Sequence, residues 1–240
     1  MNNLEKFCMG MEKVTTGIKG DDRQISEAEK LIKDLLNDFS WFTRYLLSKS
    51  LHEGTDERTG IWPNEFTIFK SRERNFSVLA YIWEPGADDK PHDHGAWGII
   101  TPVTGIINEV KYRRIDSGLK ECYAELEKIS QKIISPGSST IVLPHDKGIH
   151  SISNPGSIAA ASINVYGKGS GRGYINFFSP EKKMVTKIYP PAIQKRVLAA
   201  EAAAILTPEE TAESLKEAIR NAVPIQIKNE YRKILERLGK

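Results

Sequence analysis

Short β-rich runs fill residues 66 to 189, and this pattern constrains the fold more than any other feature. The candidate strands are FTIF, NFSVLAYIWE, WGIITPVTG, IINEVKYRR, ECYAELEKI, SSTIVLP, GIHSISN, AAASINVYG and INFF. Turn residues separate them, at Pro85-Gly86, Ser117-Gly118, Pro136-Gly137 and Pro155-Gly156 and in the cluster from Gly167 to Gly173. Runs of this length, broken by such turns, are typical of an antiparallel barrel or sandwich. The sequence therefore predicts a mainly β fold built around one barrel.

Helical patterns precede this region. Apolar residues recur every three or four positions from Leu31 to Leu46, which is the spacing of a helix face that packs on a core. Ser26 and Glu29 have the spacing of a capping box, so we expect that helix to begin near Ser26. Residues 51–64 show neither the periodicity of a helix nor that of a strand, so we predict a loop there.

The sequence turns helical again after Pro190-Pro191, because two prolines cannot continue a strand ladder. Residues 192–206 are rich in alanine, and the run from Thr207 to Glu210 predicts a capping box that starts another helix. We expect three parts, namely a helical region at 1–64 that packs on the barrel, the barrel at 65–190, and a helical extension at 191–240. The simplest roles of the extension are to cover the barrel or to form a homodimer contact.

Composition excludes several classes of protein. No stretch of the 240 residues approaches the roughly 20 apolar residues of a membrane span. The opening residues lack the apolar core of a secretion signal, so we expect a cytoplasmic protein. The net charge of +3 arises from interspersed acidic and basic residues, which gives no footprint for nucleic acid.

Three histidines have the arrangement of a metal site. His92 and His94 stand two residues apart on or just before a candidate strand, so both imidazoles can face the same side. His150 lies on a later strand and completes a set of three nitrogens if the two strands are neighbours. The alternative interpretation is a hydrogen-bonded pair in the core or an exposed polar face.

The surroundings of these histidines resemble the two signature motifs of the cupin superfamily. In the first motif, Gly86 is followed after five residues by His92-Asp93-His94, and then by Gly98 and Gly105 at the family's spacing. Most cupins place a fourth, carboxylate ligand where this chain has Gly98. The second motif is matched by His150 and Asn154. This resemblance implies a double-stranded β-helix, or jelly-roll, barrel with His92, His94 and His150 as metal ligands.

Loss of the carboxylate makes the chain similar to the thiol dioxygenases, the family of cysteine dioxygenase and 3-mercaptopropionate dioxygenase, and to its bacterial branch in particular. The resemblance runs from about Phe66 to Tyr166. It implies an enzyme that holds Fe(II) and uses O₂ to oxidise a small thiol to a sulfinate. Histidine sites also bind other divalent ions.

The same family carries a Ser-x-His-x-Tyr run beside the iron. Here Ser162, Asn164 and Tyr166 alternate along a strand and so can point inward together. The resemblance implies a catalytic role for all three, although Asn164 replaces the histidine and cannot carry a proton. The alternative for Tyr166 is a core tyrosine with a bonded hydroxyl.

The substrate pocket is less well marked. Arg172 is the nearest match to the family's carboxylate-binding arginine, and a guanidinium suits a bidentate carboxylate clamp. A loop arginine is also often just solvated. Trp97 and Tyr112 are further candidates for lining the pocket.

Two other functions fit the same residues. The first is a three-histidine cupin dioxygenase that cleaves a carbon–carbon bond, because three histidines alone do not select sulfur over carbon. The second is a non-catalytic cupin that binds a metal or another ligand and signals through its terminal helices.

Overall fold

The computed structural model describes residues 2–51, 62, 64–221 and 223–240. Most of the loop predicted at 51–64 lies outside these residues. Among the described residues the helices contain more residues than the strands, so the fold is mixed rather than mainly β. No described helix is both long and apolar enough to cross a bilayer.

Three helices open the chain: α1 (Asn3–Gly17), α2 (Asp21–Leu35) and α3 (Ser40–Leu51). The prediction that the second helix begins near Ser26 is wrong, because α2 begins five residues earlier. Gly20 serves as its N-cap with φ of 92°, and Asp21 and Asp22 place negative charge at the positive end of the helix dipole. These local signals fix the start, and Ser26 and Glu29 lie inside the helix.

The ten strands of the described residues form antiparallel pairs, which confirms the predicted antiparallel structure. The larger sheet has, in spatial order, β1 (Glu65–Lys70), β2 (Ser77–Trp83), β8 (Ala160–Tyr166), β3 (Gly98–Thr104) and β6 (Thr140–Val142). The opposite sheet has β5 (Leu126–Ile134), β4 (Ile107–Arg114) and β7 (His150–Ser153). The hairpin of β9 (Ile175–Ser179) and β10 (Met184–Ile188) completes the set, and η1 (His145–Gly148) is a short 3-10 turn before β7.

The segment from Asp88 to His92 joins β7 to the hairpin. Asp88 bridges to Ser153, and His92 bridges to both His150 and Phe177. This segment belongs to no named strand, yet it connects β7 with β9. His92 pairs with both of these strands.

The sequence missed one strand and displaced another. Met184 to Ile188 forms β10, which was not among the candidate strands, and β5 begins at Leu126 rather than Glu121. Strand β10 forms by pairing with β9, and Tyr123, in the segment before β5, makes an isolated bridge to Met184 at its start. That pairing depends on the spatial neighbourhood of two distant segments.

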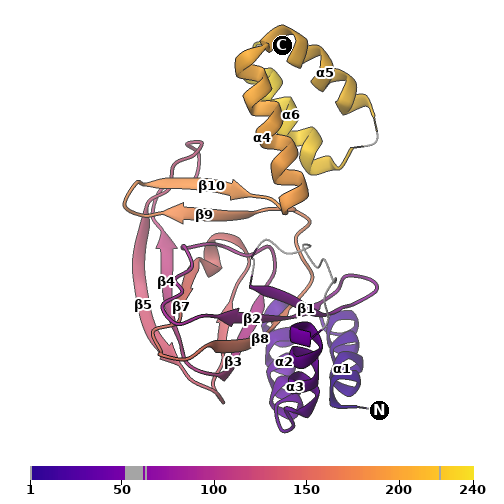
Figure 1. Ribbon diagram of the computed structural model, residues 1–240, viewed down its shortest axis with the longest axis vertical. Coiled ribbons are helices and arrows are strands. Elements are labelled where there is room, and N and C mark those ends of the chain that lie inside the picture. The colour runs from indigo at the N-terminus through magenta and orange to yellow at the C-terminus, as the bar shows by residue number, and fades with distance from the viewer. Residues whose placement is uncertain (1, 52–61, 63, 222) are drawn as a thin grey trace.

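The larger sheet is buried on both faces. Its inner face meets the opposite sheet in a shared core made of Leu79, Tyr81, Trp83, Ile100, Ile107, Ile134, Val142, Ile152 and Ala160. Its outer face packs on α1 to α3 through residues such as Val78, Ile99 and Val165. Figure 1 shows these helices gathered beside β1, β2 and β8. Alternate residues of each central strand thus face two different cores.

Three further helices form a bundle with its own core: α4 (Pro191–Leu206), α5 (Pro208–Arg220) and α6 (Ile225–Arg237). Figure 1 shows the bundle beyond the β9–β10 hairpin, on the side away from α1 to α3. Helix α5 begins where the sequence predicts, with proline at its first position, but the Thr207 side chain makes no capping hydrogen bond. The predicted start is therefore confirmed without the predicted capping box.

Candidate metal centre

Backbone pairing brings the three histidines together. His92 lies before β3, and His150 opens β7. The His92 amide donates to the His150 carbonyl at 2.8 Å, and the His150 amide donates back to the His92 carbonyl at 3.0 Å. The predicted neighbourhood of the two segments is thus present, and His94 follows two residues along the same segment.

The imidazoles converge on one point. One nitrogen from each of His92, His94 and His150 lies within 4.8 Å of the other two. The Nε2 atoms of His94 and His150 are 2.8 Å apart, and the three ring centroids are 4.8 to 5.0 Å from one another. His92 and His150 are buried, and His94 is half-buried. This cluster could hold a metal ion, as the sequence predicts.

Hydrogen bonds on the far side of two rings set their tautomers. The Nδ1 atom of His92 lies 2.8 Å from the carbonyl oxygen of Lys90, which only accepts, so Nδ1 carries the proton. The Nδ1 atom of His150 lies 2.9 Å from Oε1 of Glu109 and donates to this carboxylate in the same way. In both rings the Nε2 lone pair is left for a metal.

The histidines are held neutral. Burial lowers the pKa of His92 to about 4. Burial also places the pKa values of His94 and His150 well below the ordinary value, and the neighbouring imidazoles add to this effect. Neutral imidazole is the form that binds a cation, so the ring nitrogens fit a metal without first losing a proton.

Glu109 is a site residue that the sequence analysis missed. It lies on β4 with 1% exposure, and its second oxygen accepts from Thr140 at 2.7 Å. Burial raises the pKa of Glu109, whereas the Thr140 hydroxyl and Lys111 lower it. A carboxylate behind a ligating imidazole orients the ring and increases its basicity. Glu109 stands two residues after the fully buried Ile107 on the same strand, so both side chains face inward. This alternation is the sequence signal that could have identified Glu109.

Gly98 has no side chain to offer to the histidine cluster, and its surroundings leave little room for one. Gly98 pairs with Tyr166 on β8 and with Val142 on β6. A Cβ atom at Gly98 would lie 2.6 Å from two ring carbons of Tyr166 and 3.0 Å from Val142. The Tyr166 ring therefore occupies the space that a side chain at this position would need. The same ring stacks on His94, with centroids 5.3 Å apart.

The three residues of the strand motif form one hydrogen-bonded chain. Ser162 donates to Oδ1 of Asn164 at 2.6 Å, and Nδ2 of Asn164 donates to the Tyr166 oxygen at 3.2 Å. Ser162 and Asn164 are buried, and burial raises the pKa of Tyr166. In the second of these hydrogen bonds the Asn164 amide is the donor, so the bond does not use the phenol proton of Tyr166.

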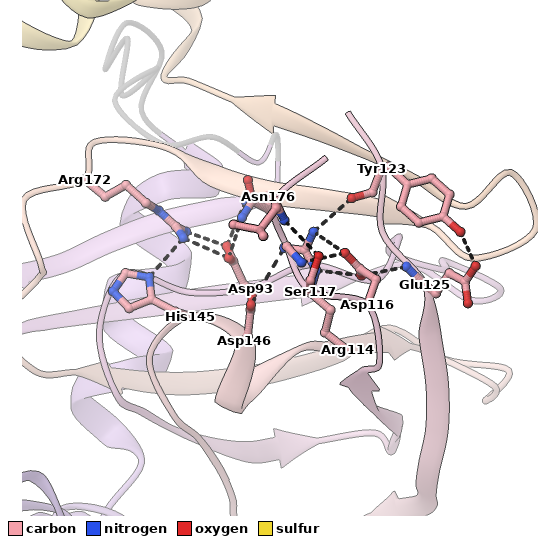
Figure 2. Close-up of polar contacts among 12 residues, drawn as sticks. Asp93, Arg114, Asp116, Ser117, Tyr123, Glu125, His145, Asp146, Arg172 and Asn176 are labelled. Atoms are coloured by element: carbon pink, nitrogen blue, oxygen red, sulfur yellow. Dashed lines mark hydrogen bonds and ion pairs between the residues drawn. The ribbon is translucent and has the colours of Figure 1, made fainter. Parts of the chain in front are cut away.

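Arg172 is engaged by Asp93, the residue between the two histidines of the first motif. Figure 2 shows its guanidinium facing the Asp93 carboxylate, with His145 on the other side. Nη1 donates to Asp93 at 2.9 Å and to Nδ1 of His145 at 2.9 Å, while Nη2 donates to the second Asp93 oxygen. Asn176 adds two more bonds to Asp93, from its backbone and side-chain nitrogens. The Asp93 side chain has no exposed area.

The remaining aromatic candidates, Trp97 and Tyr112, pack in hydrophobic clusters. Trp97 is a core residue whose indole nitrogen donates to Gln24 of α2. Tyr112 packs beside Ala124, Ile149 and Phe178. In contrast, Trp62 was not anticipated, and its ring stacks on Phe177 with centroids 4.9 Å apart and packs at a tilt against His92 with centroids 4.8 Å apart. The pocket-lining roles of Trp97 and Tyr112 stay predictions, as does the substrate role of Arg172.

No protein-family model matches the chain. Among solved structures, the chain is similar to a cupin domain of an XRE-family transcriptional regulator from Enterobacter cloacae, with 15% identity and a TM-score of 0.30 over 43% of this chain and 93% of that one. It is also similar to the Schizosaccharomyces pombe Cnp3 cupin domain, with 17% identity and a TM-score of 0.33 over 44% and 61% of the two chains. A cupin 2 conserved barrel domain protein from Salinispora arenicola gives 16% identity and a TM-score of 0.30 over 42% and 72%. All three are cupin domains, and likeness at this level says nothing of activity.

Proposed function

We propose that this chain is a non-haem iron dioxygenase of the cupin type that oxidises a small thiol to a sulfinate with O₂. The observation that carries the proposal is the donor set itself. Three neutral imidazoles converge, and the Tyr166 ring fills the place beside Gly98 where a fourth, carboxylate ligand would stand. A ferrous ion held by such nitrogens would keep its double charge and offer neighbouring positions to a thiolate and to O₂.

Contacts within the protein orient two of the imidazoles and shield one of them from water. The hydrogen bonds to Lys90 and Glu109 hold two imidazoles with Nε2 directed inward before any ligand arrives. Trp62 and Phe177 cover His92 with aromatic carbon, which keeps water from this flank. A site assembled in advance loses little free energy to reorganisation.

Tyr166 is a hydrogen-bond donor in this proposal, and it keeps its proton. Its oxygen accepts a bond from Asn164 and also contacts Tyr81, and in this proposal the hydroxyl turns to donate to an oxygen atom or a carboxylate that lies beside His94. The raised pKa keeps the phenol protonated at neutral pH. Asn164 orients the phenol but cannot relay a proton as histidine does.

The overall reaction balances without another reductant. A thiol and one O₂ give a sulfinate and one proton, with both oxygen atoms bonded to sulfur and the S–H bond lost. The four electrons that reduce O₂ come from sulfur. The proposal therefore needs no organic cofactor.

One observation favours a second candidate. Both terminal nitrogens of Arg172 bond to Asp93, so this guanidinium is not a ready clamp for a substrate carboxylate. A substrate without a carboxylate, such as an aminothiol or a diketone, needs no such clamp. Cleavage of a carbon–carbon bond in a diketone by the same three histidines is therefore the alternative.

Oxygen uptake by the ferrous protein tests these functions directly. The panel comprises cysteine, 3-mercaptopropionate, cysteamine and a simple β-diketone, and products are identified by mass spectrometry with ¹⁸O₂. The expected result is uptake with at least one thiol and two labelled oxygen atoms in the sulfinate. Uptake with the diketone alone would select the second candidate.

The control is the His150→Ala protein, which should consume no oxygen above free ferrous iron. Failure of every panel member, in protein that retains its metal, would leave a non-catalytic metal-binding cupin. The metal content of the purified protein separates that outcome from loss of the ion.

A further inference from the structure

The Tyr166 hydroxyl has two hydrogen-bond neighbours. Asn164 lies on the same strand and donates to the phenol oxygen at 3.2 Å. Tyr81 lies on β2, which pairs with β8, and its hydroxyl also forms a hydrogen bond with Tyr166. The phenol therefore has two directions in which a proton could leave, and the residues behind each neighbour decide which of them can carry it.

The Asn164 side cannot carry a proton. A neutral amide nitrogen donates a hydrogen bond but takes up no further proton at neutral pH. The amide oxygen accepts from Ser162 at 2.6 Å, and Ser162 has no exposed area. This side of Tyr166 is therefore closed to proton transfer.

The Tyr81 side ends at a carboxylate. Tyr81 faces Glu65 directly across the β1–β2 pair, and its hydroxyl donates to Oε2 of Glu65 at 2.9 Å. Figure 1 shows β1, β2 and β8 side by side, so the three side chains come from neighbouring strands. Tyr81 is buried, whereas Glu65 is half-buried. The row therefore runs from the ring that stacks on His94 to a group that water can reach.

The single proton of each phenol fixes the direction of the hydrogen bonds in this row. Tyr81 gives its proton to Glu65, so its oxygen can only accept from Tyr166. Both O–H bonds then point toward Glu65. Each phenol oxygen is thus placed to receive a proton from one side while it passes its own proton to the other.

A second carboxylate, that of Asp89, lies near both phenols. Burial is the largest cause of the raised pKa values of Tyr81 and Tyr166, and the charges of Glu65 and Asp89 add to it. Asp89 accepts from Nε1 of Trp83 at 3.1 Å, and in the described part of the chain no hydrogen bond joins it to either phenol. Glu65 is therefore the carboxylate at the end of the row.

We propose that Tyr166, Tyr81 and Glu65 form a proton relay that removes the proton of the substrate thiol. The relay rests on the proposed thiol oxidation. As a thiol binds beside His94, its proton passes to the Tyr166 oxygen, the Tyr166 proton to Tyr81, and the Tyr81 proton to Glu65. One S–H and two O–H bonds break, three O–H bonds form, and no electron is transferred. The thiol becomes a thiolate, and Glu65 becomes a carboxylic acid that loses its proton to water.

The relay leaves both phenols with one proton each. Tyr166 and Tyr81 receive a proton as they give one up, so neither becomes a phenolate and their raised pKa values do not oppose the step. The new O–H bond of Tyr166 points to the sulfur side, which is the orientation for donating to an oxygen atom beside His94. Tyr81 and Glu65 touch neither substrate nor metal and act through Tyr166. A divalent ion in the histidine cluster would stabilise the thiolate.

The connection between the three side chains is tested in the metal-free protein. Tyrosine labelled with ¹³C at Cζ reports the hydrogen bonds of each phenol by NMR, and Tyr81→Phe and Tyr166→Phe assign the two signals. Glu65→Gln keeps an acceptor but removes the negative charge, so it should shift both signals. In a Tyr81→Phe background the same change should no longer move the Tyr166 signal. A Tyr166 signal that ignores Glu65→Gln in the parent protein would overturn the relay.

Anaerobic thiol binding to the cobalt protein tests the proton transfer. Stopped-flow absorbance follows the sulfur-to-cobalt band as cysteine, 3-mercaptopropionate or cysteamine forms its thiolate. Tyr81→Phe and Glu65→Gln should each slow this band by at least ~10-fold, since a positioned proton acceptor accelerates a step by about 10²–10⁴-fold. The final absorbance and the cobalt affinity should stay unchanged, which a merely structural role would not produce. Glu65→Asp keeps a carboxylate and should recover part of the rate.

Tyr123→Phe is the matched control. It removes another phenol hydroxyl that bonds to a carboxylate, that of Glu125, outside this row. The variant should form the thiolate at the parent rate. Equal rates in Tyr81→Phe and the parent would overturn the relay and leave the proposed function intact. A parent protein that gives no sulfur-to-cobalt band with any of the three thiols would instead overturn the proposed function, and the relay with it.

Discussion

The histidine cluster and the C-terminal bundle differ in what they bury: the bundle buries mainly apolar side chains, and the cluster buries polar ones. The bundle core consists of Ala200, Ala212, Leu215, Ile227, Tyr231, Ile234 and Leu235, whose stability comes from the summed area they remove from water. Around the histidines, buried groups such as Glu109, Asp93 and Asn164 each depend on named hydrogen bonds. A buried polar group that loses its partner costs about 1–3 kcal/mol, so single substitutions should matter far more at the cluster.

Two side-chain hydrogen bonds illustrate how the bundle is joined to the β-structure. Glu230 of α6 accepts from Tyr189 at 2.8 Å and from Lys187 of β10 at 3.4 Å. These bonds join α6 of the bundle to β10 and to Tyr189 just after it. None of the three clustered histidines lies in these segments. We therefore expect damage to one region to leave the other largely unchanged.

The largest effect on the cluster should come from His150→Ala. The change removes one metal-binding nitrogen and leaves Glu109 buried without its imidazole. Affinity for Co(II), followed by its visible spectrum, should fall by more than ~100-fold, since loss of even an outer partner costs 10–100-fold. Unchanged cobalt affinity in the folded variant would contradict the assigned ligand set.

Gly98→Ala should have the next largest effect. The added methyl would lie 2.6 Å from the Tyr166 ring, and overpacking of this kind costs about 1–3 kcal/mol. Both the melting temperature and any thiol oxidation should drop. The matched control is Gly95→Ala, whose Cβ would meet only Ser170 Oγ at 3.5 Å. In a double-mutant cycle with Tyr166→Ala, Gly98→Ala should cost less stability once the ring is absent, and an equal cost in both backgrounds would argue against the clash.

Arg172→Gln should weaken metal binding indirectly, because Arg172 pairs with Asp93 between His92 and His94. The substitution breaks a pair in which Asp93 is fully buried, and metal affinity should fall by ~10-fold because the segment between His92 and His94 loses its anchor. Adding Asp93→Asn should recover part of the stability by removing the unpaired charge. Arg113→Gln offers the comparison, because its pair with Glu127 is exposed and should contribute little.

The smallest effect on the cluster should come from Leu215→Ala in the bundle. This cavity should destabilise the bundle by about 2–4 kcal/mol, while cobalt affinity should stay within ~2-fold of the parent. Thermal unfolding and a cobalt titration measure the two quantities separately. A large loss of metal affinity would show that the two regions are coupled.

The sequence predicted those parts of the molecule that depend on local patterns. The alternation of Ser162, Asn164 and Tyr166 predicted that they share one face of a strand, where the structure joins them by hydrogen bonds, and the spacing of His92 and His94 indicated convergence. Helix α5 begins at its proline as expected. In these cases the information lies within a few consecutive residues.

The missed features depend on contacts between distant segments. Glu109 meets His150 only because β4 and β7 are neighbours, and Asp93 is held by Asn176 and Arg172 from a loop and strand about eighty residues later. Capping chemistry also misled, since Ser26 and Glu29 have the right spacing while Gly20 and Asp21 start the helix. A single sequence does not show which pairs become spatial neighbours.

The close contact between Gly98 and Tyr166 has a consequence for how this barrel could change over evolutionary time. An acidic residue at position 98 could be accommodated only if the ring at position 166 moved, because the added Cβ would lie 2.6 Å from two of its carbons. A descendant that acquired a carboxylate ligand there would also have to reposition its phenol. The two changes are therefore coupled.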